Sequence, residues 1–151
     1  MAEFIKQSWL FPVIQSVHLV GITMLVGTIC LVDLRLLGIG IRRQPVVDVA
    51  SGLSPWTLGG LLTVLVTGPL LFGSDLVRYV NNPAFVLKMG LITVALVAHF
   101  TIHRRILRDG ARDENGPKAT KQKMAAVISL ILWSSVVLAG RAIADFDTRA
   151  Y

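Results

Sequence analysis

Cysteine and charged residues are both scarce in this chain. Cys30 is the only cysteine, which excludes an intramolecular disulfide. Charged residues make up 16% of the sequence, whereas an ordinary soluble domain has roughly 25%. The sequence also lacks a recognisable catalytic nucleophile, phosphate-binding loop or acid–base pair. Candidate functional residues must therefore be sought within the long apolar segments.

Apolar segments account for most of the chain. Hydrophobic residues make up 54% of it, the mean hydropathy is +0.67, and the charges are bunched between apolar runs. About 20 apolar residues in a helix cross a hydrocarbon core of ~30 Å. Four such segments, at about 9–37, 56–72, 84–103 and 124–143, predict an all-α bundle of four transmembrane helices. We expect residues 1–151 to form this bundle as a single domain.

Local signals indicate where some helices begin and end. Asn82-Pro83 predicts the start of the third helix, because Asn is a favoured N-cap and Pro a favoured first helical residue. Asp33 and Arg35 are expected to mark the cytoplasmic end of the first helix. The charged segment from Arg108 to Lys123 predicts a solvated loop.

The distribution of Lys and Arg predicts the orientation. With four spans, the first and third loops share one side, and the termini and the second loop share the other. Ten of the fifteen basic residues fall on the first side: Arg35, Arg42, Arg43, Arg104, Arg105, Arg108, Arg112, Lys118, Lys121 and Lys123. The other side has Lys6, Arg78, Arg141 and Arg149, with Lys88 just inside the third helix. The positive-inside rule then puts both termini outside a bacterial inner membrane. The net charge of +6 reflects this orientation and anionic lipid, and no motif favours nucleic acid.

His18 lies inside the first apolar segment, where the run Leu10–Val32 contains no Asp, Glu, Lys or Arg. An ionisable residue in a membrane span is costly and by default indicates a functional site. The structural alternative is a neutral histidine hydrogen-bonded to a neighbouring helix. At ~1.5 Å per residue, His18 is roughly 10–14 Å from the outer start of its helix.

Two cations are expected at the same side of the membrane as His18. Lys88 and Arg141 lie near the outer ends of the third and fourth helices. Neutral imidazole is a common ligand of haem iron, and cations can pair with haem propionates. Gly21 and Gln15 lie one turn to either side of His18. A flat macrocycle could approach the backbone at Gly21, and the Gln15 side chain could hydrogen-bond the ligand or a propionate. The group predicts a haem b site with His18 as axial ligand. Snorkelling of the cations and close helix packing at Gly21 are the alternatives.

His99 and His103 form a second pair, one turn apart on one face of the third helix. Two histidines at this spacing can hold a metal ion, but a site needs one or two further ligands. The competing hypothesis is therefore a copper-binding or copper-transport protein that uses His18, His99, His103 and Met24. A polar helix end at the membrane interface is the structural alternative.

The chain also resembles known membrane-protein families. It begins its first helix W-L-F-P-V-I-Q-S-V-H and its third N-P-A-F-V-L-K-M-G-L. It is similar to an uncharacterised bacterial family of four-helix membrane proteins and, more distantly, to the HemJ and CopD families. Eight residues match the W-L-F-P-x-I-Q-S-x-H start of the uncharacterised family: Trp9, Leu10, Phe11, Pro12, Ile14, Gln15, Ser16 and His18. The fourth-helix ending Leu138-Ala139-Gly140-Arg141 resembles the same family. HemJ proteins are taken to bind haem b through a first-helix histidine, with an essential third-helix lysine. The resemblance assigns these roles to His18 and Lys88.

The leading expectation is a haem b protein with a redox or electron-transfer role, working with a quinone or a partner protein. A haem-dependent membrane oxidoreductase is the enzyme class that the HemJ resemblance implies. A homo-oligomer is expected, because so small a bundle exposes much of its surface to lipid. The third hypothesis is a cofactor-free subunit that scaffolds partners.

Overall fold

A computed structural model shows an all-helical protein and describes residues 9–39, 44–74, 80–109 and 117–148. Its helices are α2 (Leu10–Leu36), α3 (Val46–Ser74), α5 (Pro83–Asp109) and α6 (Pro117–Thr148). All four are long and apolar enough to cross a membrane. The prediction of an all-α bundle of four membrane-spanning helices is confirmed, and the chain is a multi-pass membrane protein.

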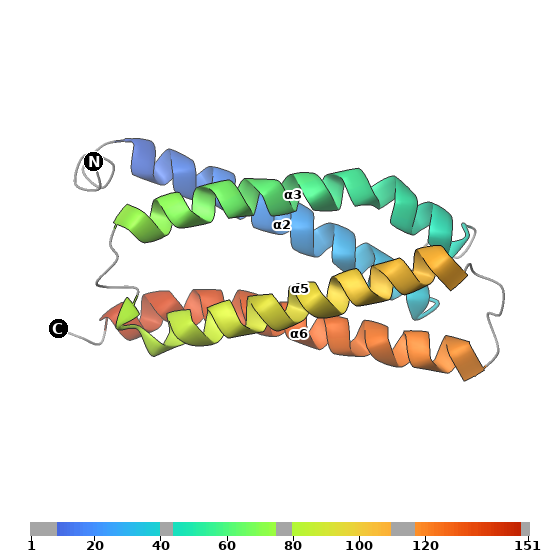
Figure 1. Ribbon diagram of the computed structural model, residues 1–151. Coiled ribbons are helices and arrows are strands. Elements are labelled where there is room, and N and C mark those ends of the chain that lie inside the picture. Colours follow the sequence, from blue (N-terminus) through green and yellow to red (C-terminus); the bar gives the residue numbers. More distant parts are fainter. Residues whose placement is uncertain (1–8, 40–43, 75–79, 110–116, 149–151) are drawn as a thin grey trace.

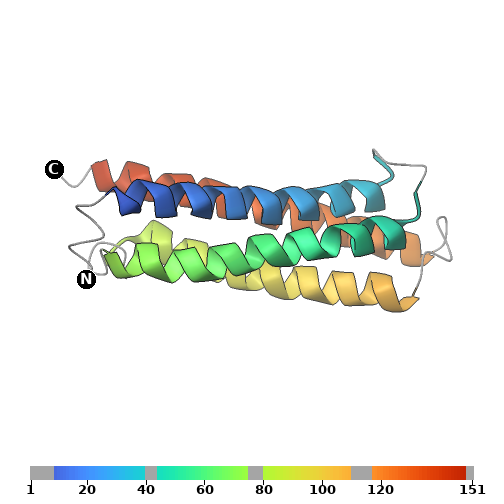
Figure 2. The same cartoon turned by 90° about the horizontal axis from the view of Figure 1, so that it is seen from above.

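The helices run antiparallel to their neighbours in a square arrangement. Figure 1 shows the two termini at one end of the bundle and the connections α2–α3 and α5–α6 at the other. In the view from above, α2 lies beside α6 and α3 beside α5, so that α2 and α5 are diagonal to each other (Figure 2). Packing is closest within the pairs α2–α3 and α5–α6, and the two pairs touch each other more loosely.

Glycines bring α2 and α3 close together. A Cβ atom added at Gly60 would lie 2.7 Å from the backbone nitrogen of Leu25 and 2.9 Å from the carbonyl oxygen of Gly21. One added at Gly21 would lie 2.9 Å from the Thr63 methyl group. Close approach through small residues is a common way for membrane helices to associate, because lipid provides no hydrophobic force between them. A hydrogen bond of 2.9 Å between the hydroxyls of Thr57 and Thr28 adds to this contact.

The helix boundaries differ in part from the predicted ones. α5 begins at Pro83, and the Asn82 side chain accepts a hydrogen bond from the Ala84 backbone at 3.0 Å. This confirms the predicted Asn-Pro start. The predicted loop at 108–123 is too long, because α5 continues to Asp109 and α6 begins at Pro117. Charged side chains extend these helices beyond the bilayer without ending them, and Pro is well suited to the first helical position. α3 likewise begins at Val46, ten residues before the apolar segment predicted for it.

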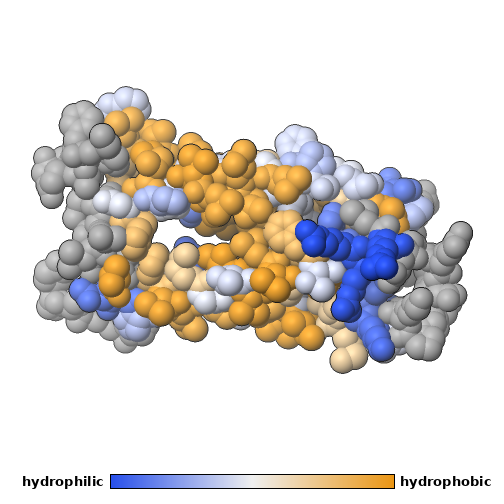
Figure 3. Space-filling model, in the orientation of Figure 1, coloured by the Kyte–Doolittle hydropathy of each residue, from blue (hydrophilic) through white to orange (hydrophobic). Residues whose placement is uncertain are grey.

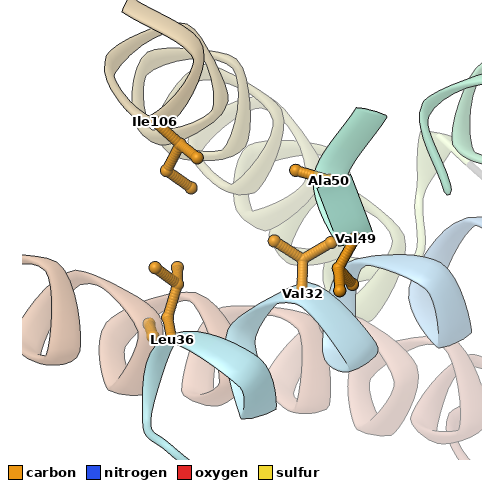
Figure 4. Packing of buried hydrophobic residues seen from close by; sticks show 6 residues of the cluster. Val32, Leu36, Val49, Ala50 and Ile106 are labelled. Carbon is orange, nitrogen blue, oxygen red and sulfur yellow. The ribbon is translucent and has the colours of Figure 1, made fainter. Parts of the chain in front are cut away.

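Two clusters of buried apolar side chains hold the helices together. The first, here called the loop-side cluster, lies toward the α2–α3 and α5–α6 connections (Figure 4). Its members are Val32, Leu36, Val49, Ala50, Ile106 and Ala126. The second, called the central cluster, lies nearer the middle of the helices and contains Leu25, Ile29, Ala95, Trp133 and Val136. Both clusters join residues of at least three helices.

The outer surface is largely apolar along the middle of the bundle (Figure 3). Large aliphatic side chains such as Leu62, Val97 and Leu138 are mostly exposed, as expected for a surface that faces lipid. Hydrophilic side chains gather at the end with the helix connections (Figure 3). The exposed residues Arg104, Arg105, Arg108, Lys121 and Lys123 belong to the helix segments at that end. Of the other basic residues used to predict orientation, Lys6, Arg42, Arg43, Arg78, Arg112 and Arg149 lie outside the described residues.

The close α2–α3 contact predicts that a larger residue at Gly60 destabilises the bundle. Gly60→Ala would place a methyl group against the α2 backbone, and overpacking of this kind typically costs about 1–3 kcal/mol. We expect a lower midpoint of thermal unfolding in detergent. Gly52→Ala is the matched control in the same helix, because a Cβ there meets nothing within 4 Å. Equal midpoints for the two variants would show that the helices do not depend on this contact.

Candidate functional site

The His18 side chain is held by α3. Its Nδ1 lies 2.7 Å from Oγ1 of Thr67, and the Thr67 hydroxyl donates its only proton to the Thr63 carbonyl at 2.6 Å. The bond to the ring must then use Nδ1–H as the donor and Thr67 Oγ1 as the acceptor. This fixes the tautomer, and it leaves the lone pair of Nε2 free of a proton. An imidazole oriented through one nitrogen is prepared to bind a metal through the other.

Lys88 on α5 comes close enough to His18 for its charge to act on the ring. The lysine side chain also crosses the α5–α6 contact, since a Cβ at Gly140 would lie 3.5 Å from its Nζ. His18 and Lys88 belong to helices that are diagonal in the bundle, so their interaction reaches across its interior. The structure thus brings together two of the residues that the sequence predicted for one site.

An opening separates the two helix pairs in the half of the bundle that holds the chain termini (Figure 3). Toward the termini, a stack of Phe72 on Phe85 joins α3 to α5, with ring centroids 5.2 Å apart. Farther from the termini, Leu61 and Leu96 line the same small pocket. Eleven residues separate these two levels on each helix, which is roughly 16 Å at the rise of an α-helix. The levels of Thr67 on α3 and Lys88 on α5 lie between them.

The other predicted members of the haem site are placed differently. Gly21 is buried against Thr63 and has the helix-packing role that was its alternative. A macrocycle therefore cannot lie on the backbone there. Gln15 is exposed one turn before His18. Arg141 is also exposed and directly follows Gly140, the residue that the Lys88 side chain covers.

His99 and His103 lie together, as their spacing predicts, with stacked rings whose centroids are 5.7 Å apart. They line a pocket of about 20 Å³ with residues of α3 that include Ser54 and Thr57. Thr57 lies ten residues from Thr67, the partner of His18, which is about 15 Å along α3. The two histidine sites are therefore separate levels of the bundle.

No group of three or more His, Cys, Asp or Glu side chains is arranged to hold a metal ion within the described part of the chain. Met24 on α2 packs against α3 instead, with its terminal methyl 3.9 Å from where a Gly59 Cβ would be. The pair His99–His103 thus has two nitrogen ligands without a third protein ligand from the described residues.

Sequence reasoning missed Thr67, the residue that orients His18. Its only signal was an apolar helix with hydroxyls at Thr63 and Thr67, one turn apart. Membrane helices commonly carry such threonines hydrogen-bonded to their own backbone. Only the packing of α2 on α3 distinguishes the one that faces His18.

Comparison with known proteins identifies the family but no function. The model of a family of unknown function, DUF6644, matches residues 10–146. No curated protein and no solved structure matches the chain, and the resemblance to HemJ and CopD proteins therefore stays a prediction. Because the match covers nearly the whole chain, including all of α2, α3 and α5, the protein belongs to the DUF6644 family.

Proposed function

We propose that this protein binds haem b in the half of the bundle that contains the termini, with His18 as axial ligand. The observation that carries the proposal is the hydrogen bond from His18 Nδ1 to Thr67. It orients the ring and leaves Nε2 as the only nitrogen able to bind iron. Histidines that bind metals in proteins nearly always donate their other N–H in this way.

The surrounding residues fit such a group in charge and in space. Lys88 supplies a positive charge beside His18, which suits a haem propionate. The opening between the helix pairs lies in the same half of the bundle (Figure 3). The α3 backbone lies beside the ring at Gly68, where a Cβ would be 3.6 Å from His18 Cε1, in ordinary van der Waals contact. Arg141 is the second proposed propionate partner, from the end of the span in α6.

A bound haem would supply one-electron redox chemistry to the membrane interior. The protein would hold it through His18, compensate its propionates through Lys88 and Arg141, and surround it with apolar side chains. We propose an electron-transfer role with a quinone or a partner protein, in a bacterial inner membrane with both termini outside. A homo-oligomer is part of the same proposal. Copper binding at His99 and His103 is the competing hypothesis, and a cofactor-free scaffold the third.

The histidine variants test the site directly. His18→Ala should abolish haem retention on purification from haem-supplied cells, because the iron loses its protein ligand. His99→Ala is the control, since His99 belongs to the separate pocket near Thr57, and it should retain haem. The absorbance of bound haem per protein measures both. Retention of haem by the His18 variant and its loss from the His99 variant would instead assign the haem site to the level of His99.

Thr67 should act through His18. Thr67→Val keeps the shape of the side chain but removes the acceptor of the Nδ1–H bond, and loss of such a support typically weakens metal binding about 10- to 100-fold. Titration of apoprotein with haemin measures this. Thr93→Val is the matched control, because the Thr93 hydroxyl is exposed and bonds only to its own helix at Met89. The role of Thr67 is refuted if both variants bind haemin as the parent protein does.

Lys88 should contribute through its charge. Lys88→Met keeps an unbranched side chain over Gly140, and we expect about tenfold weaker haem binding or more, since a hydrogen bond to a charged group is worth ~1.5–3 kcal/mol. The thermal midpoint of the apoprotein should change little. The control Lys121→Met removes an exposed charge at the opposite end of the bundle. If the haemin affinity is unchanged by Lys88→Met, the lysine only reaches toward lipid headgroups.

A further inference from the structure

Buried polar side chains lie where the loop-side cluster and the central cluster meet. Asp33 on α2 is 3% exposed, and Ser129 and Trp133 on α6 are each 2% exposed. The Ser129 side chain lies beside the Asp33 carboxyl group. Yet Asp33 Oδ2, Ser129 Oγ and Trp133 Nε1 are fully enclosed without a hydrogen-bond partner from the described residues. An unsatisfied buried polar group costs about 1–3 kcal/mol, so three together call for an explanation.

The register of α2 and α6 brings these three groups to one place. The helices are antiparallel, and the central cluster joins Ile29 to Trp133 one turn from the level of Asp33 and Ser129. Side chains on a helix lean toward its N-terminus. Trp133 therefore leans toward the level of Ser129, and Asp33 leans toward the level of Ile29 and Trp133. This register puts the indole and the carboxyl group at neighbouring levels of the two helices.

The types of polar atom specify what can fill this place. Trp133 Nε1–H can only donate a hydrogen bond, an ionised Asp33 oxygen can only accept one, and the Ser129 hydroxyl can do both. A water molecule satisfies all three, because it can accept from the indole and donate to the carboxylate. A metal ion fits less well, since the indole N–H would point its positive end toward the cation. The described residues also provide no group of three or more His, Cys, Asp or Glu side chains that could hold a metal ion.

No cation of the described residues neutralises Asp33. On α2 itself, the Arg35 side chain donates a hydrogen bond from Nε to the Gln44 carbonyl at 2.7 Å. Cys30, also on α2, is half-buried and close enough to Asp33 for an electrostatic interaction. Toward the connections, the charged side chains described on the neighbouring helices are exposed: Asp48 on α3, Arg104, Arg105 and Arg108 on α5, and Lys121 and Lys123 on α6. His99 and His103 face the α3 side of the bundle, where they line the pocket with Ser54 and Thr57. Among the described residues, a proton is therefore the remaining way to neutralise the carboxylate.

We propose that Asp33, Ser129 and Trp133 form a proton-binding site, in which an internal water molecule transfers a proton to and from Asp33 Oδ2. The transfer forms one O–H bond on the carboxyl group and breaks one on the water, and the hydroxide left behind takes up a proton that enters from the aqueous side. Asp33 lies three residues before the end of α2, about 5 Å from the connections. The site does not depend on haem, and its failure would leave the proposal for His18 untouched.

Infrared spectroscopy of the purified protein tests this site. The spectrum should gain a carboxylic-acid band between mildly alkaline and mildly acidic buffer, in a range where an exposed aspartate, which titrates near about 3.9, stays ionised. The band should be lost in Asp33→Asn, which keeps the shape but cannot take up a proton. It should persist in Asp48→Asn, the control at an exposed aspartate on α3. Ser129→Ala should shift its frequency, because the carboxyl group loses a neighbouring hydroxyl.

The outcomes separate the proposal from a purely structural aspartate. Absence of the band from the parent protein, or its persistence in Asp33→Asn, would overturn the proposal. If Asp33→Asn does not fold, the Ser129→Ala spectrum decides, and an unshifted band would then overturn it. Loss of the band in Asp48→Asn would assign the band to Asp48 and would therefore also refute the site at Asp33.

Discussion

The contact between α2 and α3 is the constraint on which the candidate haem site depends. Gly60 presses against the α2 backbone near Gly21 and Leu25, and this brings the hydroxyls of α3 within reach of polar groups on α2. Two hydrogen bonds use that proximity: Thr57 to Thr28, and His18 to Thr67. The bonded positions are ten residues apart on both helices, so one antiparallel register satisfies both. A wider helix pair would leave His18 without its partner and its ring without a fixed orientation.

The loose contact between the two helix pairs complements this tight one. The closest packing lies within the pairs α2–α3 and α5–α6. The opening between the pairs lies toward the termini, whereas the loop-side and central clusters close the rest of the bundle. The bundle is thus closely packed toward the helix connections and open toward the chain termini. His18 and Lys88 lie in the open half, and Asp33 lies in the closely packed half.

Much of this fold could be predicted from the sequence, since apolar length alone identifies membrane-spanning helices, and Asn82-Pro83 fixes the start of α5. The nearness of His18 to Lys88 also followed from their depths. What a single sequence does not contain is which helix faces turn toward each other. For that reason the role of Thr67 was missed, and Gly21 was open to two interpretations until Thr63 was found against it. Asp33 was predicted as a marker of a helix end, but the packing of α6 encloses it beside Ser129. The boundaries of α3, α5 and α6 extend past the apolar segments, because charged residues continue a helix into water.

The central claim is that this bundle is a b-type cytochrome, and the absorption spectrum of the purified protein tests it most directly. Protein expressed with ample haem should show a Soret band when oxidised and sharp α and β bands after reduction with dithionite. Metal analysis of the same sample should find iron. A featureless spectrum would contradict the claim. Bound copper would then favour the site at His99 and His103, and a metal-free protein would favour the scaffold.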